Sequence, residues 1–262
     1  MDSREAKPKY DPDWSLKARP KHLPYTPHPH WDECERCLRN LRVLHTGVPF
    51  YNPLGGIPSA HMVPLSETCT EYASIVNMFN ADSDGLMRVL SVHRVQNDAL
   101  YQQYHMTLNT MIMDSVGTFE ERTHLCHSSS ASLDELVVEG LDPRLSSVGL
   151  FGRGTYATPS PAKASSYWKG TSEVRTMFIV RMILGLVYVF SDGKFDHTLV
   201  REPRGYDSVK GNITGHDEYV VYKGDRVLIE YVVRYLDYTP PLAPVRVTVP
   251  PAPAVPSSTG ND

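Results

Sequence analysis

The segment from Glu218 to Tyr235 reads EYVVYKGDRVLIEYVVRY and is the part of the chain that best defines its fold. It contains two runs rich in β-branched and aromatic residues, Glu218 to Tyr222 and Arg226 to Tyr235, separated by a short polar connection with a glycine. Such runs are typical of β-strands, and a short connection of this kind favours a hairpin. We therefore predict two strands here that pair with each other.

Two further segments upstream have the pattern of strands. Phe178 to Phe190 is a long apolar stretch of β-branched and aromatic residues, broken near Gly185. His124 to His127 is shorter and leads into a run of three serines. Polar residues at the end of a predicted strand mark a place where a functional site is often built.

Helices are predicted only in the earlier part of the folded region. Asn97 can cap a helix in which one face is apolar, as shown by Leu100, Tyr104, Leu108 and Met111. Ser132 and Glu135 form a capping-box pattern for a short second helix that ends at Gly140. A few early helices followed by a run of strands predict an α+β domain with a mostly antiparallel sheet.

Composition excludes several classes of protein. The chain has 262 residues, of which 41% are hydrophobic, so it can bury a core and is not disordered throughout. Its formal net charge is −4, which gives no general attraction to nucleic acid or to an anionic membrane. The apolar window from Met177 to Phe190 contains Arg181 and is shorter than the roughly 20 residues of a membrane helix.

The distribution of prolines and cysteines predicts three regions. Residues 1–61 form an extended, partly disordered arm that includes Cys34 and Cys37; residues 62–238 form the folded domain; and residues 239–262 form a proline-rich disordered tail. Four cysteines are too few for a secreted disulfide scaffold, and the first thirty residues do not resemble a signal peptide. We therefore expect an intracellular protein, nuclear or cytoplasmic.

Three polar clusters stand at the ends of predicted strands. They are His127 with the serines that follow it, the glycine-rich turn from Gly149 to Tyr156 that continues to Tyr167, and Glu218. Each cluster alone has an ordinary structural interpretation, because such residues also cap strands, pack in cores or face solvent.

Together, in this order and spacing, the clusters resemble the catalytic domain of the poly(ADP-ribose) polymerase family, whose members are ADP-ribosyltransferases with a His-Tyr-Glu triad. The resemblance runs from about Met62 to Tyr238. It is based on five motifs: VHRVQN at 92–97 followed by Leu100 and Tyr104, LCHSS at 125–129, LFGRGTY at 150–156, the Ala162 to Tyr167 segment, and DEYVVY at 217–222 with IEYVVRY at 229–235.

The resemblance implies the ADP-ribosyltransferase fold, a mostly antiparallel split β-sheet with a few flanking helices, and NAD⁺ as substrate. It implies that Glu218 stabilises the oxocarbenium-like transition state, that His127 binds a ribose hydroxyl, and that Tyr156 and Tyr167 flank the nicotinamide. His127, Tyr156 and Glu218 are thus the expected catalytic residues. The remaining residues expected to bind the dinucleotide are Ser128, Ser129, Gly152 and Lys163, with Lys163 or Arg153 able to reach the pyrophosphate. No metal is expected in this site.

The sequence departs from the family pattern at two positions. Ser128 stands where the family normally has a glycine whose backbone holds the nicotinamide amide, and Ala164 stands where it commonly has a serine. Losing one neutral hydrogen bond costs about 0.5–1.5 kcal/mol. The loop from Pro143 to Val148, which covers the donor site in the family, is also short. An inactive domain that binds ADP-ribose or a partner protein is therefore the alternative.

Other functional questions stay open from the sequence alone. The acceptor is a protein, which includes the chain itself, or a nucleic acid, and Glu218 permits either single transfer or polymer synthesis. The oligomeric state is not defined. The spacing of Cys34 and Cys37 also permits a zinc site and hence an RNA-binding function, which a single pair of cysteines supports only weakly.

Overall fold

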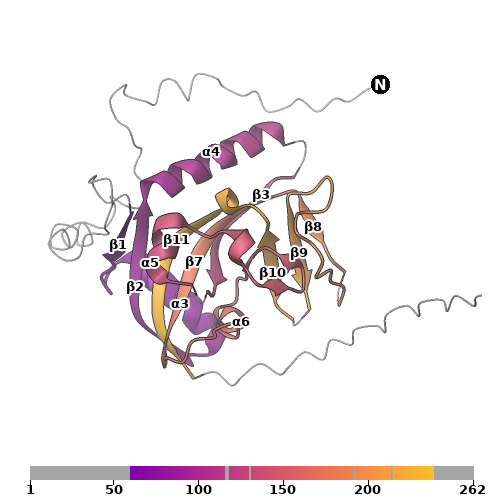
Figure 1. Ribbon diagram of the computed structural model, residues 1–262. Coiled ribbons are helices and arrows are strands. Elements are labelled where there is room, and N and C mark those ends of the chain that lie inside the picture. The colour runs from indigo at the N-terminus through magenta and orange to yellow at the C-terminus, as the bar shows by residue number, and fades with distance from the viewer. Residues whose placement is uncertain (1–59, 116–117, 130, 192, 214, 239–262) are drawn as a thin grey trace, which may run out of the picture.

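The computed structural model describes residues 60–115, 118–129, 131–191, 193–213 and 215–238 (Figure 1). The predicted arm lies outside these residues except for Ala60 and His61, which begin the first strand, and the predicted tail and the pair Cys34 and Cys37 lie outside them too. Within them the chain has the predicted α+β organisation, with helices around two main sheets.

The larger sheet has five antiparallel strands. Its strands in spatial order are β1 (Ala60–Pro64), β2 (Met87–Asn97), β11 (Val227–Asp237), β7 (Val174–Gly185) and β3 (Glu120–His127). The central strands β7 and β11 are almost continuously apolar because both faces of the sheet are covered.

The smaller sheet has four strands, and a short hairpin lies beside it in the chain. The sheet consists of β6 (Thr155–Ala157), β10 (Asp217–Val221), β9 (Ser208–Asn212) and β8 (Val187–Val189), and the hairpin of β4 (Val148–Gly149) and β5 (Gly152–Arg153). Only the pair β8 and β9 is parallel among these strands. The two sheets meet where Cys126 of β3 and Thr158 exchange backbone hydrogen bonds of 2.7 and 3.1 Å.

The predicted hairpin between the last two strand runs is wrong. Both runs are strands, but β10 pairs with β6 and β9, whereas β11 pairs with β2 and β7 in the other sheet. The connection contains the 3-10 turn η2 (Gly224–Arg226), and the Arg226 guanidinium donates a hydrogen bond to the carbonyl oxygen of Asp207. This turn directs the chain from one sheet to the other.

Four α-helices and a second 3-10 turn complete the described fold. They are α3 (Thr70–Ser83), α4 (Asp98–Asp114), α5 (Leu133–Glu139), η1 (Pro143–Leu145) and α6 (Pro161–Ser165). In Figure 1, α4 lies at one end of the larger sheet, and α3 and α6 lie toward the other end. None of the helices within the described ranges has the length and apolarity needed to span a bilayer.

The start of α4 confirms the predicted cap at Asn97. Its side-chain oxygen accepts a hydrogen bond of 3.0 Å from the Leu100 amide, and its side-chain amide donates to the carbonyls of Val137 and Val138 at 2.9 Å. One asparagine therefore caps α4 and also fixes the end of α5. This double use explains why an asparagine is needed at the end of β2.

Two smaller predictions were partly wrong. The helix α5 begins after Ser132 and ends before Gly140, but the Ser132 side chain makes no capping hydrogen bond. The strand predicted from His124 begins earlier, at Glu120, because β3 is an edge strand whose first residues are charged and polar. The pairing of β3 with β7 shifts between Arg122 and Leu125, and His124 has a φ of 57° there.

Candidate active site

The predicted site residues converge where the two sheets meet. His127 is the last residue of β3, and its ring nitrogen Nδ1 donates a hydrogen bond of 2.7 Å to the carbonyl oxygen of Tyr156 in β6. Since Nδ1 carries the proton, Nε2 of the neutral ring is left as an acceptor. Burial lowers the pKa of His127, and the bond to Tyr156 only partly opposes this effect. A neutral His127 can therefore accept a hydrogen bond from a sugar hydroxyl.

The glycine-rich turn holds Tyr156 by its hydroxyl group. The hydroxyl accepts a hydrogen bond from the Phe151 amide and donates one to the Gly152 carbonyl, each at 2.8 Å. A Cβ atom at Gly149 would lie 2.7 Å from this hydroxyl, and Gly152 has a φ of 80° with its backbone against Leu199. These two glycines therefore allow the turn to close over the tyrosine. Burial raises the pKa of Tyr156, so its hydroxyl stays protonated.

Glu218 is in β10, adjacent to β6, and is only 2% exposed. Its Oε1 accepts a hydrogen bond of 2.6 Å from the Tyr167 hydroxyl, and its Oε2 lies 3.9 Å from Nζ of Lys163. The Lys163 ammonium also lies over the Tyr167 ring, 4.8 Å from its centroid. The carboxylate thus faces two side chains that are four residues apart, Lys163 in the helix Pro161–Ser165 and Tyr167 in the turn that follows it.

Burial, and after it the charge of Glu218, shifts the pKa values of Lys163 and Tyr167. Burial lowers the pKa of Lys163, and the charge of Glu218 partly opposes that shift. Burial raises the pKa of Tyr167, and the charge of Glu218 and the hydrogen bond to it raise the pKa further. Tyr167 is therefore a hydrogen-bond donor to Glu218 across the physiological range.

Lys163 and Arg153, the two cations predicted to reach the pyrophosphate, lie in different surroundings. Its side chain is 6% exposed and its ammonium group lies beside the carboxylate of Glu218. Arg153 is exposed, and its guanidinium donates to the carbonyl of Arg144. Lys163 is thus part of the Glu218 cluster, whereas Arg153 lies at the surface, and their contact with a pyrophosphate stays a prediction.

Ser128 and Ser129, two of the predicted binding residues, lie in different surroundings, and Ala164 is buried where the family commonly has a serine. The Ser128 Oγ is buried and has no hydrogen-bond partner among the described residues. The Ser129 Oγ accepts a local hydrogen bond from the Ala131 amide at 3.1 Å. Ala164 is 1% exposed, and the neighbouring Ser165 points elsewhere, as the helical geometry predicts, where it bonds to Arg175 and Asp237.

The short helix α6, which contains Lys163, is fixed by carboxylates that sequence reasoning missed. Asp82 of α3 accepts hydrogen bonds of 2.8 Å from the Ser160 hydroxyl and the Ala162 amide. Asp237 of β11 accepts from the Ser165 hydroxyl and from Arg175. Both aspartates are far from α6 in sequence. Asp237 comes two residues after the IEYVVRY motif, but no pattern in the sequence links it or Asp82 to α6.

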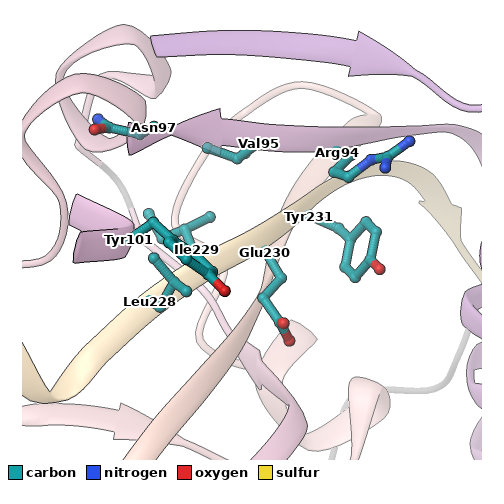
Figure 2. A pocket seen from close by; sticks show the side chains of 8 residues that line it. All are labelled: Arg94, Val95, Asn97, Tyr101, Leu228, Ile229, Glu230 and Tyr231. Carbon is teal, nitrogen blue, oxygen red and sulfur yellow. The ribbon is translucent and has the colours of Figure 1, made fainter. Parts of the chain in front are cut away.

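A separate pocket lies between β2 and β11 (Figure 2). Tyr101 and Leu228 lie together at one end of it, and Arg94 and Tyr231 at the other. The Tyr231 hydroxyl donates a hydrogen bond of 2.9 Å to Glu71, which also pairs with Arg94 at 3.4 Å. The eight residues that line this pocket are labelled in Figure 2, and none of them is predicted to bind the dinucleotide.

The arrangement can serve bond cleavage at a sugar carbon. A buried carboxylate can stabilise positive charge that develops on a ribose, because its effect is strong in a site that excludes water. A neutral histidine and two aromatic rings nearby can orient the sugar and the base. A split antiparallel sheet that brings a histidine, two tyrosines and a glutamate together defines an ADP-ribosyltransferase fold.

The comparison with known families identifies the particular class. The family model "Poly(ADP-ribose) polymerase catalytic domain" matches residues 69–216, more than half of the chain. The chain therefore belongs to this family, whose ADP-ribosyltransferases use NAD⁺ as substrate. The match ends just before β10, so the placement of Glu218 depends on the strand geometry described above.

Two curated relatives are similar over most of the folded region. The human protein mono-ADP-ribosyltransferase PARP12 is 26% identical over 190 residues, which cover 70% of this chain and 27% of that protein. The mouse protein of the same name is 26% identical over 191 residues, which cover 70% of this chain and 26% of that protein. The chain thus spans about a quarter of the length of these relatives.

Proposed function

We propose that this chain is an active ADP-ribosyltransferase that moves ADP-ribose from NAD⁺ to an acceptor protein and releases nicotinamide. The observation on which this depends is that Glu218 is buried beside Tyr167 and Lys163, in the strand next to the one that contains Tyr156. Tyr156 in turn binds His127 through its carbonyl. Family membership supports the reaction class, and the cluster supplies the groups that the reaction needs.

The proposed reaction assigns one task to each group. The bond between the anomeric carbon of the ribose and the nicotinamide nitrogen breaks, and its electron pair stays on nicotinamide, which leaves as a neutral molecule. Glu218 stabilises the positive charge on the sugar, and His127 Nε2 accepts a hydrogen bond from a ribose hydroxyl. An acceptor oxygen then forms the new bond to the anomeric carbon. A carboxylate acceptor needs no proton transfer, whereas a hydroxyl acceptor releases its proton to a base or to water.

We further propose single transfer rather than polymer synthesis. Both curated relatives are mono-ADP-ribosyltransferases by name. In addition, Glu218 accepts a hydrogen bond from Tyr167 and its other oxygen faces Lys163, so a hydroxyl of a second ADP-ribose would have to compete with these two groups for the carboxylate. We expect the chain to act inside the cell, in the nucleus or cytoplasm, because its four cysteines are few and Cys69 and Cys126 form no disulfide within the described residues.

The test is incubation with NAD⁺ that carries a label on its adenosine part, followed by electrophoresis. The wild-type chain should label itself or an added protein as a discrete band. Glu218→Ala should abolish the label, while Asp225→Ala, which removes an acid from the turn just after β10, should not. A ladder of products would contradict single transfer. Equal labelling by the wild type and Glu218→Ala would contradict the proposed mechanism.

A second candidate, an inactive domain that binds ADP-ribose or a partner, is favoured by one observation. Ser128 replaces the family glycine, and its hydroxyl is enclosed without a hydrogen-bond partner in the described part of the chain. Calorimetry with ADP-ribose, together with an assay of nicotinamide release from NAD⁺, separates the two proposals. The inactive domain would bind ADP-ribose and release no nicotinamide from NAD⁺, whereas the transferase releases nicotinamide at a rate that depends on Glu218.

A further inference from the structure

The turn that holds Tyr156 borders a surface with several exposed arginines. Four of them, Arg144, Arg153, Arg201 and Arg204, are called here the arginine lip. The Arg153 amide donates a hydrogen bond of 2.8 Å to the Leu199 carbonyl, and its guanidinium donates one of 3.3 Å to the Arg144 carbonyl. The segments that contain these arginines therefore lie side by side, although about fifty residues separate them in the chain.

Most of the charge of the arginine lip is not neutralised. Arg144 is paired with Asp142, but Arg153, Arg201 and Arg204 form no ion pair with a carboxylate in the described ranges. Glu202, between two of these arginines, is 15% exposed and points to Lys223 and Arg226 instead. A local excess of positive charge stands out in a chain whose formal net charge is −4.

Apolar side chains are interspersed with these cations. Leu145 is 86% exposed, Val200 is 73% exposed and Val148 is 54% exposed. Each of them lies next to an arginine of the lip. Leu145 follows Arg144 in the sequence, Val200 precedes Arg201, and Val148 pairs with Arg153 in the hairpin of β4 and β5. Exposed apolar residues within a charged rim are typical of a surface that binds another protein.

The arginine lip lies next to the reaction centre. The backbone of its hairpin binds the Tyr156 hydroxyl through Phe151 and Gly152, and the carbonyl of the same tyrosine binds His127. One tyrosine therefore connects the lip to the histidine of the proposed site. An acceptor protein must bring its reacting oxygen to about 3–3.5 Å from the sugar carbon. The residues on either side of the reacting one must then contact the surface around the site, which includes the arginine lip.

We infer that the arginine lip docks the acceptor protein through an acidic segment that also contains apolar side chains. This inference depends on the proposed transferase function and adds the chemical class of its acceptor. The alternative of a nucleic acid acceptor fits less well, because a phosphate backbone offers nothing to Leu145, Val148 and Val200 and is repelled by the net charge of the whole chain.

The first experiment measures binding without catalysis. A short fluorescent peptide that repeats Glu-Leu-Glu-Gly is titrated with the chain, and anisotropy is recorded at low and at physiological ionic strength. Its counterpart with Gln in place of Glu, and a single-stranded DNA with a terminal phosphate, serve as comparison probes. The acidic peptide should bind most tightly. Equal binding of the Gln peptide, or tighter binding of the DNA, would overturn the inference.

The second experiment compares charge reversals. Arg201→Glu and Arg204→Glu should each weaken binding of the acidic peptide roughly threefold, the size expected for an exposed ion pair. Arg88→Glu, the same change at an exposed position of β2 in the larger sheet, is the matched control and should have no effect. Equal binding by the lip variants and the control would overturn the inference.

Kinetics with NAD⁺ separate this inference from the proposed function. If the peptide is a substrate, Arg201→Glu with Arg204→Glu should raise the KM for the peptide about tenfold and leave the KM for NAD⁺ unchanged. A rise in the KM for NAD⁺ instead would assign the arginines to the donor and overturn the inference. If the wild type binds the peptide as expected but releases no nicotinamide with any acceptor, the transferase proposal fails, while the binding result still supports the lip as an interaction surface.

Discussion

Removing the hydroxyl of Tyr167 should slow catalysis without weakening NAD⁺ binding. The hydroxyl donates a hydrogen bond of 2.6 Å to Glu218, whose side chain is 3% exposed. Tyr167→Phe leaves the aromatic ring for contact with the nicotinamide but leaves one carboxylate oxygen without its donor. A misplaced Glu218 would stabilise the transition state less well than before.

The size of the effect follows from the exposure of the two partners. A hydrogen bond to a charged group contributes about 1.5–3 kcal/mol. Tyr167 is 44% exposed, so water can replace part of the lost bond. We therefore expect a loss of about 1 kcal/mol in transition-state stabilisation, which corresponds to roughly a fivefold fall in kcat. The KM for NAD⁺ should change less than twofold or so, because ring contacts are kept.

The assay is the initial rate of nicotinamide release at varied NAD⁺ concentration. Tyr238→Phe is the control, since it removes a hydroxyl from a tyrosine that is 63% exposed at the far end of β11. The reasoning would be refuted if Tyr167→Phe raised KM and left kcat unchanged. It would also be refuted if both variants behaved as the wild type does.

Three further predictions concern the turn, the histidine and the serine beside it. Gly152→Ala should lower the free energy of unfolding by about 2–4 kcal/mol, since a Cβ at a φ of 80° would meet backbone 1.9 Å away. The control is Gly193→Ala, where φ is 75° but the space is open, and it should lower the free energy by only about 1–2 kcal/mol. Thermal unfolding measures both. Burial lowers the pKa of His127 from its ordinary 6.5, so the neutral histidine contributes its full stability above that pH, and this stability is lost as the pH falls toward the pKa of the folded state. His127→Gln should therefore make the free energy of unfolding less dependent on pH in the acid range. An unchanged pH dependence would contradict this. Ser128→Ala should not lower the free energy of unfolding, because the Oγ has no partner to lose in the described residues, and a loss above about 1 kcal/mol in urea titration would show a bond that the structure lacks.

The sequence predicted strands and helices well where local chemistry determines them. The cap at Asn97 succeeded because a side chain must satisfy the free amides of a helix start, and the break at Gly185 succeeded because the backbone there has a φ of 58°. The prediction that β10 pairs with β11 was wrong, because a short polar connection such as Lys223 to Asp225 fits either a hairpin or a change of sheet. What decides between them is the contact of Arg226 with Asp207, nineteen residues apart, which no local pattern contains.

The site shows the same division between local and distant determinants. His127, Tyr156, Tyr167 and Glu218 could be chosen as candidates because each lies in a motif, whereas the contact of Lys163 with Glu218 could not be foreseen. Its direction depends on α6, which Asp82 holds from α3 and Asp237 holds from β11. Short motifs thus supply the side chains of the site, while the distances between these side chains depend on single residues in other elements. Asp237→Asn leaves every motif intact but should lower the rate of nicotinamide release, because it changes the position of Lys163 and Tyr167. The free energy of unfolding is measured in parallel. A fall in rate while the variant is still folded at the assay temperature would show that Asp237 acts through the geometry of the site.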